Sequence, residues 1–433
     1  MGFRVQLGID RLRMGLLACG FLLLALAGSV QAVVVDRLYD AVVPVEDTGT
    51  DVRQEAFREA LRQVLLRLTG DPARVQRMVP DDTGGEQPQE ALGDHAARFI
   101  EAFSYRRNGK QLELHATLST AAVGQALADR QVPVWGATRP RILLWFLVDG
   151  RGERKLIHRD NILPPFLEKP MQPLDSEALA AERGPWKEPL WETSRQRGMP
   201  LALPFNDDRD RAQVGLSEIW GLFQEPIRRA SRRYPHDVMA IARVNRDGDG
   251  WRARWQLRRG DDRIADGVTR ANDRADVAQQ LVNAWADQLA GRYAVAPASG
   301  EALRSARMLI ADVEGLGPYA AVRQSLAGLE PIRSVQIDAI HQDRLTLELA
   351  FNGDLRLLLD YIGLDERMVL MGGPPDGAIP SGSTTDGDAL RLYYRWDQDR
   401  AAIGMGPGSD EAQEIVPLDS AEEGSGGSAP SLQ

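Results

Sequence analysis

The residue types that usually carry catalysis or bind metal ions are few and scattered in this chain of 433 residues. No two of its five histidines stand at the spacing of metal ligands. The one cysteine, Cys19, lies in an apolar N-terminal stretch, and no serine stands in a Gly-x-Ser-x-Gly elbow. We therefore predict no catalytic residue, no metal site and no cofactor, and expect that the protein is not an enzyme.

Three local patterns could still bind a ligand, and each has a simpler interpretation. Residues 245–250 resemble a calcium loop, but Asn245 stands where that loop needs Asp, and Gln256 stands where it needs Glu. A hairpin turn explains the same residues. Residues 315–318 join a predicted strand to a helix without the full dinucleotide fingerprint, which favours a plain turn. Paired acids at 207–208 and 261–262 lie in predicted loops or turns, as solvated acids do.

Arginine and tryptophan clusters are the better candidates for function. Four arginines crowd one predicted helix, where they form either a solvated face or a contact for anionic lipid headgroups or an acidic protein surface. Three tryptophans, Trp186, Trp191 and Trp220, lie in Pro-rich or irregular surroundings, where they either pack the loops or form hot spots of a protein interface. Six of these residues make up the predicted interaction surface: Arg228, Arg229, Arg232, Arg233, Trp186 and Trp191.

The N-terminus has the pattern of a signal peptide. Three arginines before residue 14 precede an apolar stretch over residues 14–27, and Val30 and Ala32 supply the small residues of a cleavage site. We predict cleavage between Ala32 and Val33, since an apolar stretch of this length is short for a membrane span. The expected location is therefore the periplasm. The alternatives are an uncleaved anchor in the inner membrane and lipidation at Cys19, although the apolar run continues past that cysteine.

Composition limits the class of protein. The chain is 43% hydrophobic and 26% charged, which is typical of globular proteins, and its length predicts more than one domain. Its formal net charge of −10 argues against a nucleic-acid partner, because nucleic-acid binders are usually basic.

The strongest structural signals lie between residues 139 and 295. Residues 142–148 are an unbroken apolar run, typical of a strand buried on both faces. Residues 251–258 alternate between apolar residues and polar or arginine residues, which predicts one buried face and one wet face. Residues 277–293 show a helical apolar repeat. This central module has the order βαβαβββα, which loosely resembles the amino-terminal domain of the Tol system's periplasmic propeller protein.

Two smaller modules flank the central one. Residues 33–132 predict a βαββα module, with a helix over 51–69 that ends at Gly70 and a hairpin across Asn108-Gly109. Residues 304–397 predict a βαββαβ module of the ferredoxin-like order. Residues 398–433 have little apolar content, so we expect a disordered tail. The predicted fold class is α/β (α+β) with three small mixed-sheet modules, after a signal peptide over residues 1–32.

Several separated motifs resemble a known family. They are Leu38-Tyr39-x-Ala41-x-Val43-Pro44-Val45, residues 53–70, Arg141-Ile142-Leu143-Leu144-Trp145 and Arg197-Gly198-x-Pro200-Leu201. Together they are similar to the proteobacterial family called domain of unknown function 2066. The resemblance covers most of residues 33–397 and implies an exported envelope protein of Gram-negative bacteria, without an assigned activity or catalytic residues to carry over.

The sequence thus predicts an exported protein that acts by binding. We expect another envelope protein as its partner, with peripheral contact to an anionic membrane surface as a second kind of contact. The alternatives are a hydrolase that acts on cell-wall or lipid material, and a carrier of a small ligand or lipid.

Overall fold

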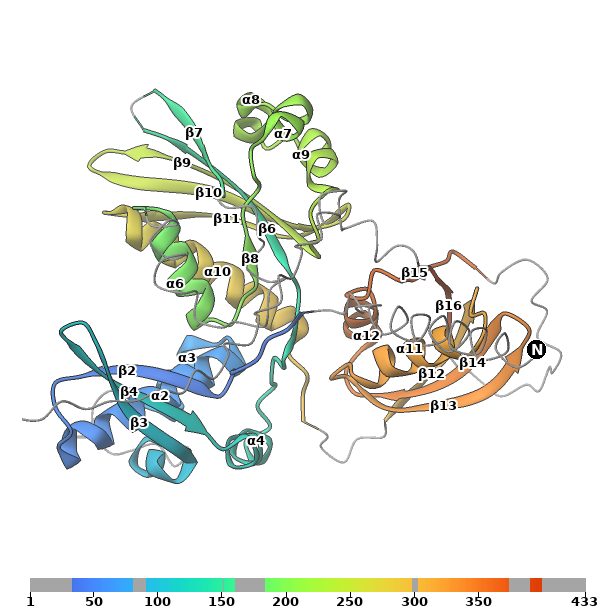
Figure 1. Ribbon diagram of the computed structural model, residues 1–433, viewed down its shortest axis with the longest axis horizontal. Helices are drawn as coiled ribbons and strands as arrows, with labels where there is room; N and C mark the ends of the chain where they lie inside the picture. The colour runs from blue at the N-terminus through green and yellow to red at the C-terminus, as the bar shows by residue number, and fades with distance from the viewer. Residues whose placement is uncertain are drawn as a thin grey trace, which may run out of the picture.

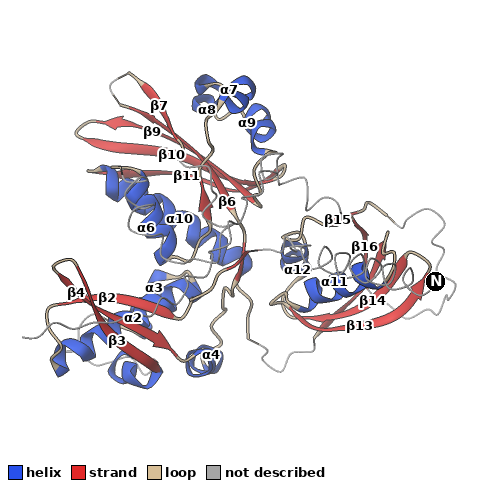
Figure 2. Cartoon of the chain, viewed as in Figure 1, coloured by secondary structure: helices blue, strands red, loops and turns tan. Residues whose placement is uncertain are grey.

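The computed structural model describes residues 33–80, 91–150, 152–159, 184–297, 303–373 and 390–398. Three groups of helices and strands, each built on its own sheet, form a mixed α/β structure (Figure 1). Figure 2 shows helices packed beside every one of these sheets. Residues 1–32, with the predicted signal peptide and Ala32, and the tail after residue 398 lie outside the described residues. Val33 is the first residue described.

The N-terminal module is a three-stranded antiparallel sheet covered by a long helix. The sheet order is β2–β4–β3, and α2 packs on the sheet through buried residues such as Leu61 and Leu65. Gly70 ends α2 in the left-handed conformation, as the sequence predicts. The elements are β1 Val33–Val34, β2 Asp40–Val45, α2 Thr50–Thr69, α3 Pro72–Met78, the 3-10 helix η2 Gly93–Phe99, β3 Ile100–Asn108, β4 Gln111–Leu118 and α4 Thr120–Asp129.

The central module is a mixed sheet with helices on both faces. Its order is β11–β10–β9–β6–β7, with β8 pairing β6, and β6 is parallel to β9. The elements after the short strand β5 Thr138–Arg139 are β6 Ile142–Asp149, β7 Arg154–Ile157, α6 Lys187–Gln196, β8 Leu201–Ala202, α7 Asp208–Gln213, α8 Leu216–Gly221, α9 Gln224–Ser231, β9 Val238–Asp247, β10 Gly250–Arg259, β11 Asp262–Ala271 and α10 Arg274–Tyr293.

The two faces of the central sheet are covered to different extents. Helices α6 and α10 lie along one face, and α7, α8 and α9 lie over the other (Figure 1). Every residue from Ile142 to Val148 is buried, because β6 lies between these two layers of helices. The hairpin ends of β9 and β10 extend beyond α7–α9 in the view of Figure 1.

The C-terminal module has the predicted ferredoxin-like order. Its sheet runs β13–β14–β12–β16, and β12 is parallel to β16, as that order requires. The short strand β15 extends the β16 edge and was not predicted. The elements are β12 Arg304–Ala311, α11 Leu316–Ala327, β13 Ile332–His341, β14 Arg344–Phe351, α12 Leu355–Ile362, β15 Met368–Leu370 and β16 Leu390–Trp396.

Buried arginines join the N-terminal module to the central one. Arg139 is fully buried, stacks 3.9 Å from the centre of the Trp135 ring, and donates to the backbone oxygens of Arg67, Arg197, Trp135 and Gly136. Arg67 donates in turn to the oxygens of residues 37, 38, 40 and 196. Burial lowers the pKa of Arg139 to about 9 and that of Arg67 to about 10, so both stay charged at neutral pH. The two charges are compensated mainly by carbonyl dipoles.

Ion pairs join the central module to the C-terminal one. Arg141 pairs with Asp237 at 2.9 Å and with Glu366 at 2.5 Å, and the side chains of Arg141 and Asp237 are each only 2% exposed. Asp360 accepts from Arg259 and Arg292.

Several local predictions were wrong. Residues 150–186 are polar and Pro-rich, which predicts an insertion over the core, but Arg154–Ile157 forms strand β7 and pairs with β6. The sequence predicts that Asn272 caps α10, but the cap is Asp273, since its carboxylate accepts from the Asp276 amide. Residues 33–45 are rich in valine, which predicts one strand, but they form two, β1 and β2, and β1 pairs with β5. That pairing ties residues 33–34 to the linker before β6, so the module boundaries stay predictions.

A candidate anion-binding face on the central module

Two of the four predicted helix arginines are held by acids within the chain. Arg228 pairs with Glu225 and lies 3.6 Å from Asp261. Arg233, just after α9, pairs with Asp207 at 2.6 Å and with Asp210 at 3.3 Å. These contacts neutralise much of the charge that the sequence places on this helix.

The other two arginines remain available. Arg229 and Arg232 are exposed, and neither has an ion pair with another described residue. They lie at the C-terminal end of α9, where positive charge is also favoured by the helix dipole.

The two predicted tryptophans do not form a surface. Trp186 is only 6% exposed and packs against the rings of Phe146 and Trp251. Trp191 is half-buried against the same core. Trp186 was therefore placed wrongly on the interaction surface, because its Pro-rich surroundings are folded onto the sheet through α6.

A third tryptophan, Trp220 on α8, lies among arginines instead. The guanidinium of Arg154 is 4.5 Å from the centre of its ring, and that of Arg243 is 5.3 Å away. Arg243 also donates to the backbone oxygen of Trp220 at 2.6 Å. Strands β7 and β9 thus present two cations to one half-buried ring, an arrangement that stabilises the cations without neutralising them.

Two more arginines extend this cluster along β10. Arg254 stands directly opposite Arg243 in the antiparallel register, and Arg252 is two residues away on the same face. Burial and the charges of Arg254, Arg252 and Arg154 lower the pKa of the Arg243 guanidinium. One acid, Asp149, pairs with Arg154 at 3.5 Å. We call this surface the Trp220 face; its residues are Arg154, Trp220, Arg243, Arg252 and Arg254.

Exposed apolar side chains border the Trp220 face. Val268 on β11 is opposite Arg254 and 40% exposed. Leu216, which begins α8, is 40% exposed, and Phe223, just before α9, is 58% exposed. Arginine and aromatic residues are enriched at protein interfaces, together with apolar side chains.

Sequence reasoning found part of this face and missed the rest. The alternation over residues 251–258 correctly placed Arg252 and Arg254 on a wet face. The contact of Arg154 with Trp220 could not be predicted from the sequence, because strand β7 was not predicted. Trp220 was noted only as an aromatic residue in irregular surroundings, since nothing local indicates which strands α8 covers.

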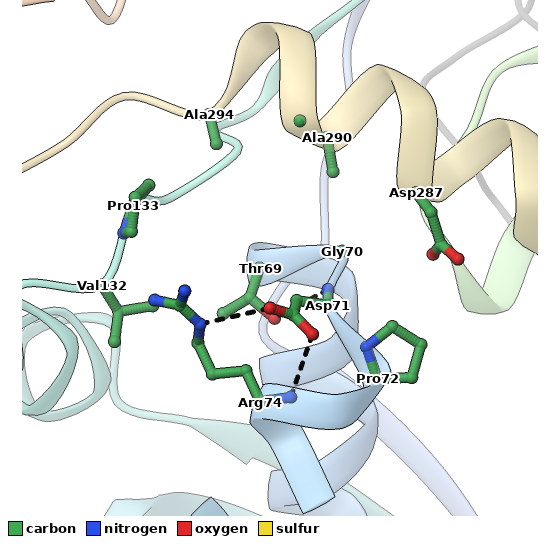
Figure 3. Close-up of a pocket in the computed structure, with 11 residues that line it drawn as sticks. Thr69, Gly70, Asp71, Pro72, Arg74, Val132, Pro133, Asp287, Ala290 and Ala294 are labelled. Atoms are coloured by element: carbon green, nitrogen blue, oxygen red, sulfur yellow. Dashed lines mark hydrogen bonds and ion pairs between the residues drawn. The ribbon is translucent and has the colours of Figure 1, made fainter.

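Figure 3 shows a pocket at the junction of the N-terminal and central modules, where polar groups also come together as they do on the Trp220 face. It has a volume of about 400 Å³ and lies between the α2–α3 corner and α10. Its charged groups are already paired: Arg74 with Asp71 at 3.3 Å, and Asp287 with Arg197 at 2.6 Å. Because these charges are compensated within the fold, the pocket gives a weaker indication of a ligand than the Trp220 face does.

Within the described ranges, no three histidine, cysteine or acidic side chains are grouped as metal ligands would be. Among the described helices, none combines the length and apolar character that crossing a membrane requires.

Comparison with known proteins corrects the family resemblance. The family model that matches is Domain of unknown function (DUF8605), over residues 32–136. The resemblance to domain of unknown function 2066 is therefore wrong, although the motifs between residues 38 and 70 lie inside the matched region. No curated protein and no solved structure matches the chain. The match ends before β6, so it does not bear on the Trp220 face, and the likeness to a Tol-type domain stays a prediction.

Proposed function

We propose that this protein acts by binding another protein of the cell envelope, and that the Trp220 face receives an acidic surface of that partner. The observation that carries the proposal is the grouping of Arg154, Arg243, Arg252 and Arg254 around Trp220, with one acid paired to the group. Keeping like charges this close is unfavourable unless an anion compensates them. Arg229 and Arg232 add positive charge at the C-terminal end of α9, so the wider surface favours an acidic partner over a neutral one.

The spacing of the arginines suits an extended acidic segment. Residues two apart on a strand lie about 6.6 to 6.8 Å apart on one face, so Arg252 and Arg254 present charges at that interval. An extended peptide with acidic residues at alternate positions presents carboxylates at the same interval. Arginine can bind each carboxylate through two parallel hydrogen bonds.

Binding to an acidic polypeptide tests this proposal. Fluorescence anisotropy with labelled poly-glutamate should show binding that weakens as salt is raised, because exposed charges are screened. Changing Arg252 and Arg254 together to Glu should weaken binding about tenfold or more, equivalent to about 1.4 kcal/mol. The change Arg228→Glu/Arg232→Glu should have a smaller effect, because Arg228 already pairs with Glu225. Salt-independent binding, or equal effects of the two double changes, would argue against the Trp220 face.

The proposed location is the periplasm, reached through a cleaved signal peptide. The support is the arginine-flanked apolar stretch over residues 14–27 followed by Val30 and Ala32. The expected intact mass of the exported protein is that of a chain beginning at Val33 without a lipid. A mass that keeps residues 1–32, or one that shows a diacylglycerol group on Cys19, would overturn this prediction.

A further inference from the structure

We propose that the segment after Gln398 folds back onto the Trp220 face and occupies it until an acidic partner displaces the segment. This inference rests on the proposed function, because it takes the same face as an acceptor of acidic chains. It adds an internal competitor, and so a means by which the chain regulates its own binding.

Charge complementarity is the first argument. Residues 399–433 contain a single arginine, Arg400, and seven acidic residues: Asp399, Asp410, Glu411, Glu414, Asp419, Glu422 and Glu423. The Trp220 face holds four arginines and one paired acid, and Arg229 and Arg232 lie on the neighbouring helix. Opposite charges carried on one chain meet at a high local concentration.

Apolar complementarity is the second argument. The acidic residues Glu414 and Asp419 enclose the sequence Ile415-Val416-Pro417-Leu418. The border of the Trp220 face exposes Leu216, Phe223 and Val268, which are 40%, 58% and 40% exposed. A segment that carries both acids and branched apolar residues matches both parts of this surface.

The place where the segment leaves the fold is the third argument. The amide of Asp397 donates to the backbone oxygen of Arg367, and the preceding residue, Glu366, contacts Arg141 at 2.5 Å. Arg141 also pairs with Asp237, which follows Arg232 by five residues. The described chain therefore ends near the N-terminal end of β9, and Arg243 of the Trp220 face lies six residues after Asp237 along that strand, about 20 Å away.

The length of the segment is sufficient. The acidic stretch begins at Asp410, twelve residues after Gln398. Twelve residues span at most about 40 Å when extended, and as a flexible chain they separate their ends by roughly 20 Å. A linker of this kind gives an effective concentration on the order of 1 mM. If the segment binds the face with a dissociation constant of about 0.1 mM, it should weaken the binding of a competing chain about tenfold.

Removing the segment is the first test. A chain that ends at Gln398 keeps every described helix and strand, since β16 ends at Trp396. It should unfold within about 2 °C of the full chain, because weak docking contributes little to stability. In the anisotropy assay it should bind labelled poly-glutamate about tenfold more tightly than the full chain does. The same comparison made with Arg252→Glu/Arg254→Glu in both chains should show no such difference.

Supplying the segment in trans is the second test. A labelled peptide of residues 399–423 should bind the shortened chain and should bind the full chain about tenfold less tightly. A control peptide, in which every Asp and Glu is changed to Asn or Gln, should bind neither chain. This control separates the acidic side chains from the apolar residues, which it keeps.

The outcomes separate the two proposals. If poly-glutamate binding depends on Arg252 and Arg254 but is unchanged by removal of the segment, the internal competitor is overturned and the proposed function stands. If the shortened chain binds neither poly-glutamate nor the acidic peptide, both proposals are overturned. If the acidic peptide binds the full and shortened chains equally, the segment does not occupy the face.

Discussion

Replacing Arg139 with methionine should lower the free energy of unfolding by about 3 to 5 kcal/mol, because several buried backbone oxygens lose the donor that satisfies them. The guanidinium is fully buried and donates to four backbone oxygens drawn from both sides of the module junction. Methionine fills much of the volume but leaves these oxygens without donors, and each unsatisfied buried acceptor costs about 1 to 3 kcal/mol. Urea denaturation monitored by circular dichroism measures the change.

The control for this prediction keeps the charge and changes the geometry. Arg139→Lys should also destabilise the protein, because one ammonium group cannot reproduce the planar fork that reaches four oxygens and stacks on Trp135. Arg304, an exposed arginine that begins β12, supplies the comparison. Arg304→Met should change stability by no more than about 0.5 kcal/mol. A loss below about 1 kcal/mol for Arg139→Met would show that the arginine network does not hold the junction.

Replacing Trp255 with alanine should cost about 3 to 5 kcal/mol, the usual range for deleting a large core aromatic. The side chain is only 6% exposed, its ring centre lies 6.5 Å from that of Trp285, and its indole nitrogen donates to the Thr269 hydroxyl at 3.2 Å. Gly267 stands directly opposite in the register, and a methyl group there would lie 2.6 Å from the Trp255 ring. The ring therefore covers a glycine as well as α10, and its loss leaves a cavity on both sides.

Arg254 is the matched control for Trp255, because it precedes Trp255 by one residue on the same strand and points to the opposite face. Arg254→Ala should change the free energy of unfolding by no more than about 0.5 kcal/mol, or should raise it by relieving repulsion from Arg243. Equal losses of unfolding free energy for Arg254→Ala and Trp255→Ala would contradict the register, which gives β10 one buried face and one exposed face.

The fold could be predicted from sequence where the residues of one short stretch are enough to show which side chains are buried or where an element ends. The alternation around Trp255 indicates its buried face without reference to any partner, and the glycine at position 70 marks the end of α2. The ferredoxin-like order followed from the succession of helices and strands, because few topologies fit that succession. These features depend on spacing within one element or on its immediate neighbours.

The features that sequence could not predict depend on contacts between distant residues. Nothing around Arg139 indicates that its side chain would meet the backbone of residue 67 on one side and residue 197 on the other. Trp186 was placed on the surface because its neighbours are polar and Pro-rich, yet α6 carries it into the core. The Trp220 face is formed by residues from three strands and from α8, which are far apart in the sequence. Only the alternation that contains Arg252 and Arg254 could be recognised from the sequence.

We propose that the Trp220 face, and not the net charge of the chain, is what binds acidic partners. The most direct measurement is the ratio of two dissociation constants for poly-glutamate, one for Arg252→Glu/Arg254→Glu and one for Arg304→Glu/Arg391→Glu, both made in the chain that ends at Gln398. Arg304 and Arg391 are exposed on the C-terminal module, so both variants carry the same change in charge. We predict that the Arg252→Glu/Arg254→Glu chain binds poly-glutamate about tenfold more weakly than the Arg304→Glu/Arg391→Glu chain. Equal dissociation constants for the two chains would contradict the proposal.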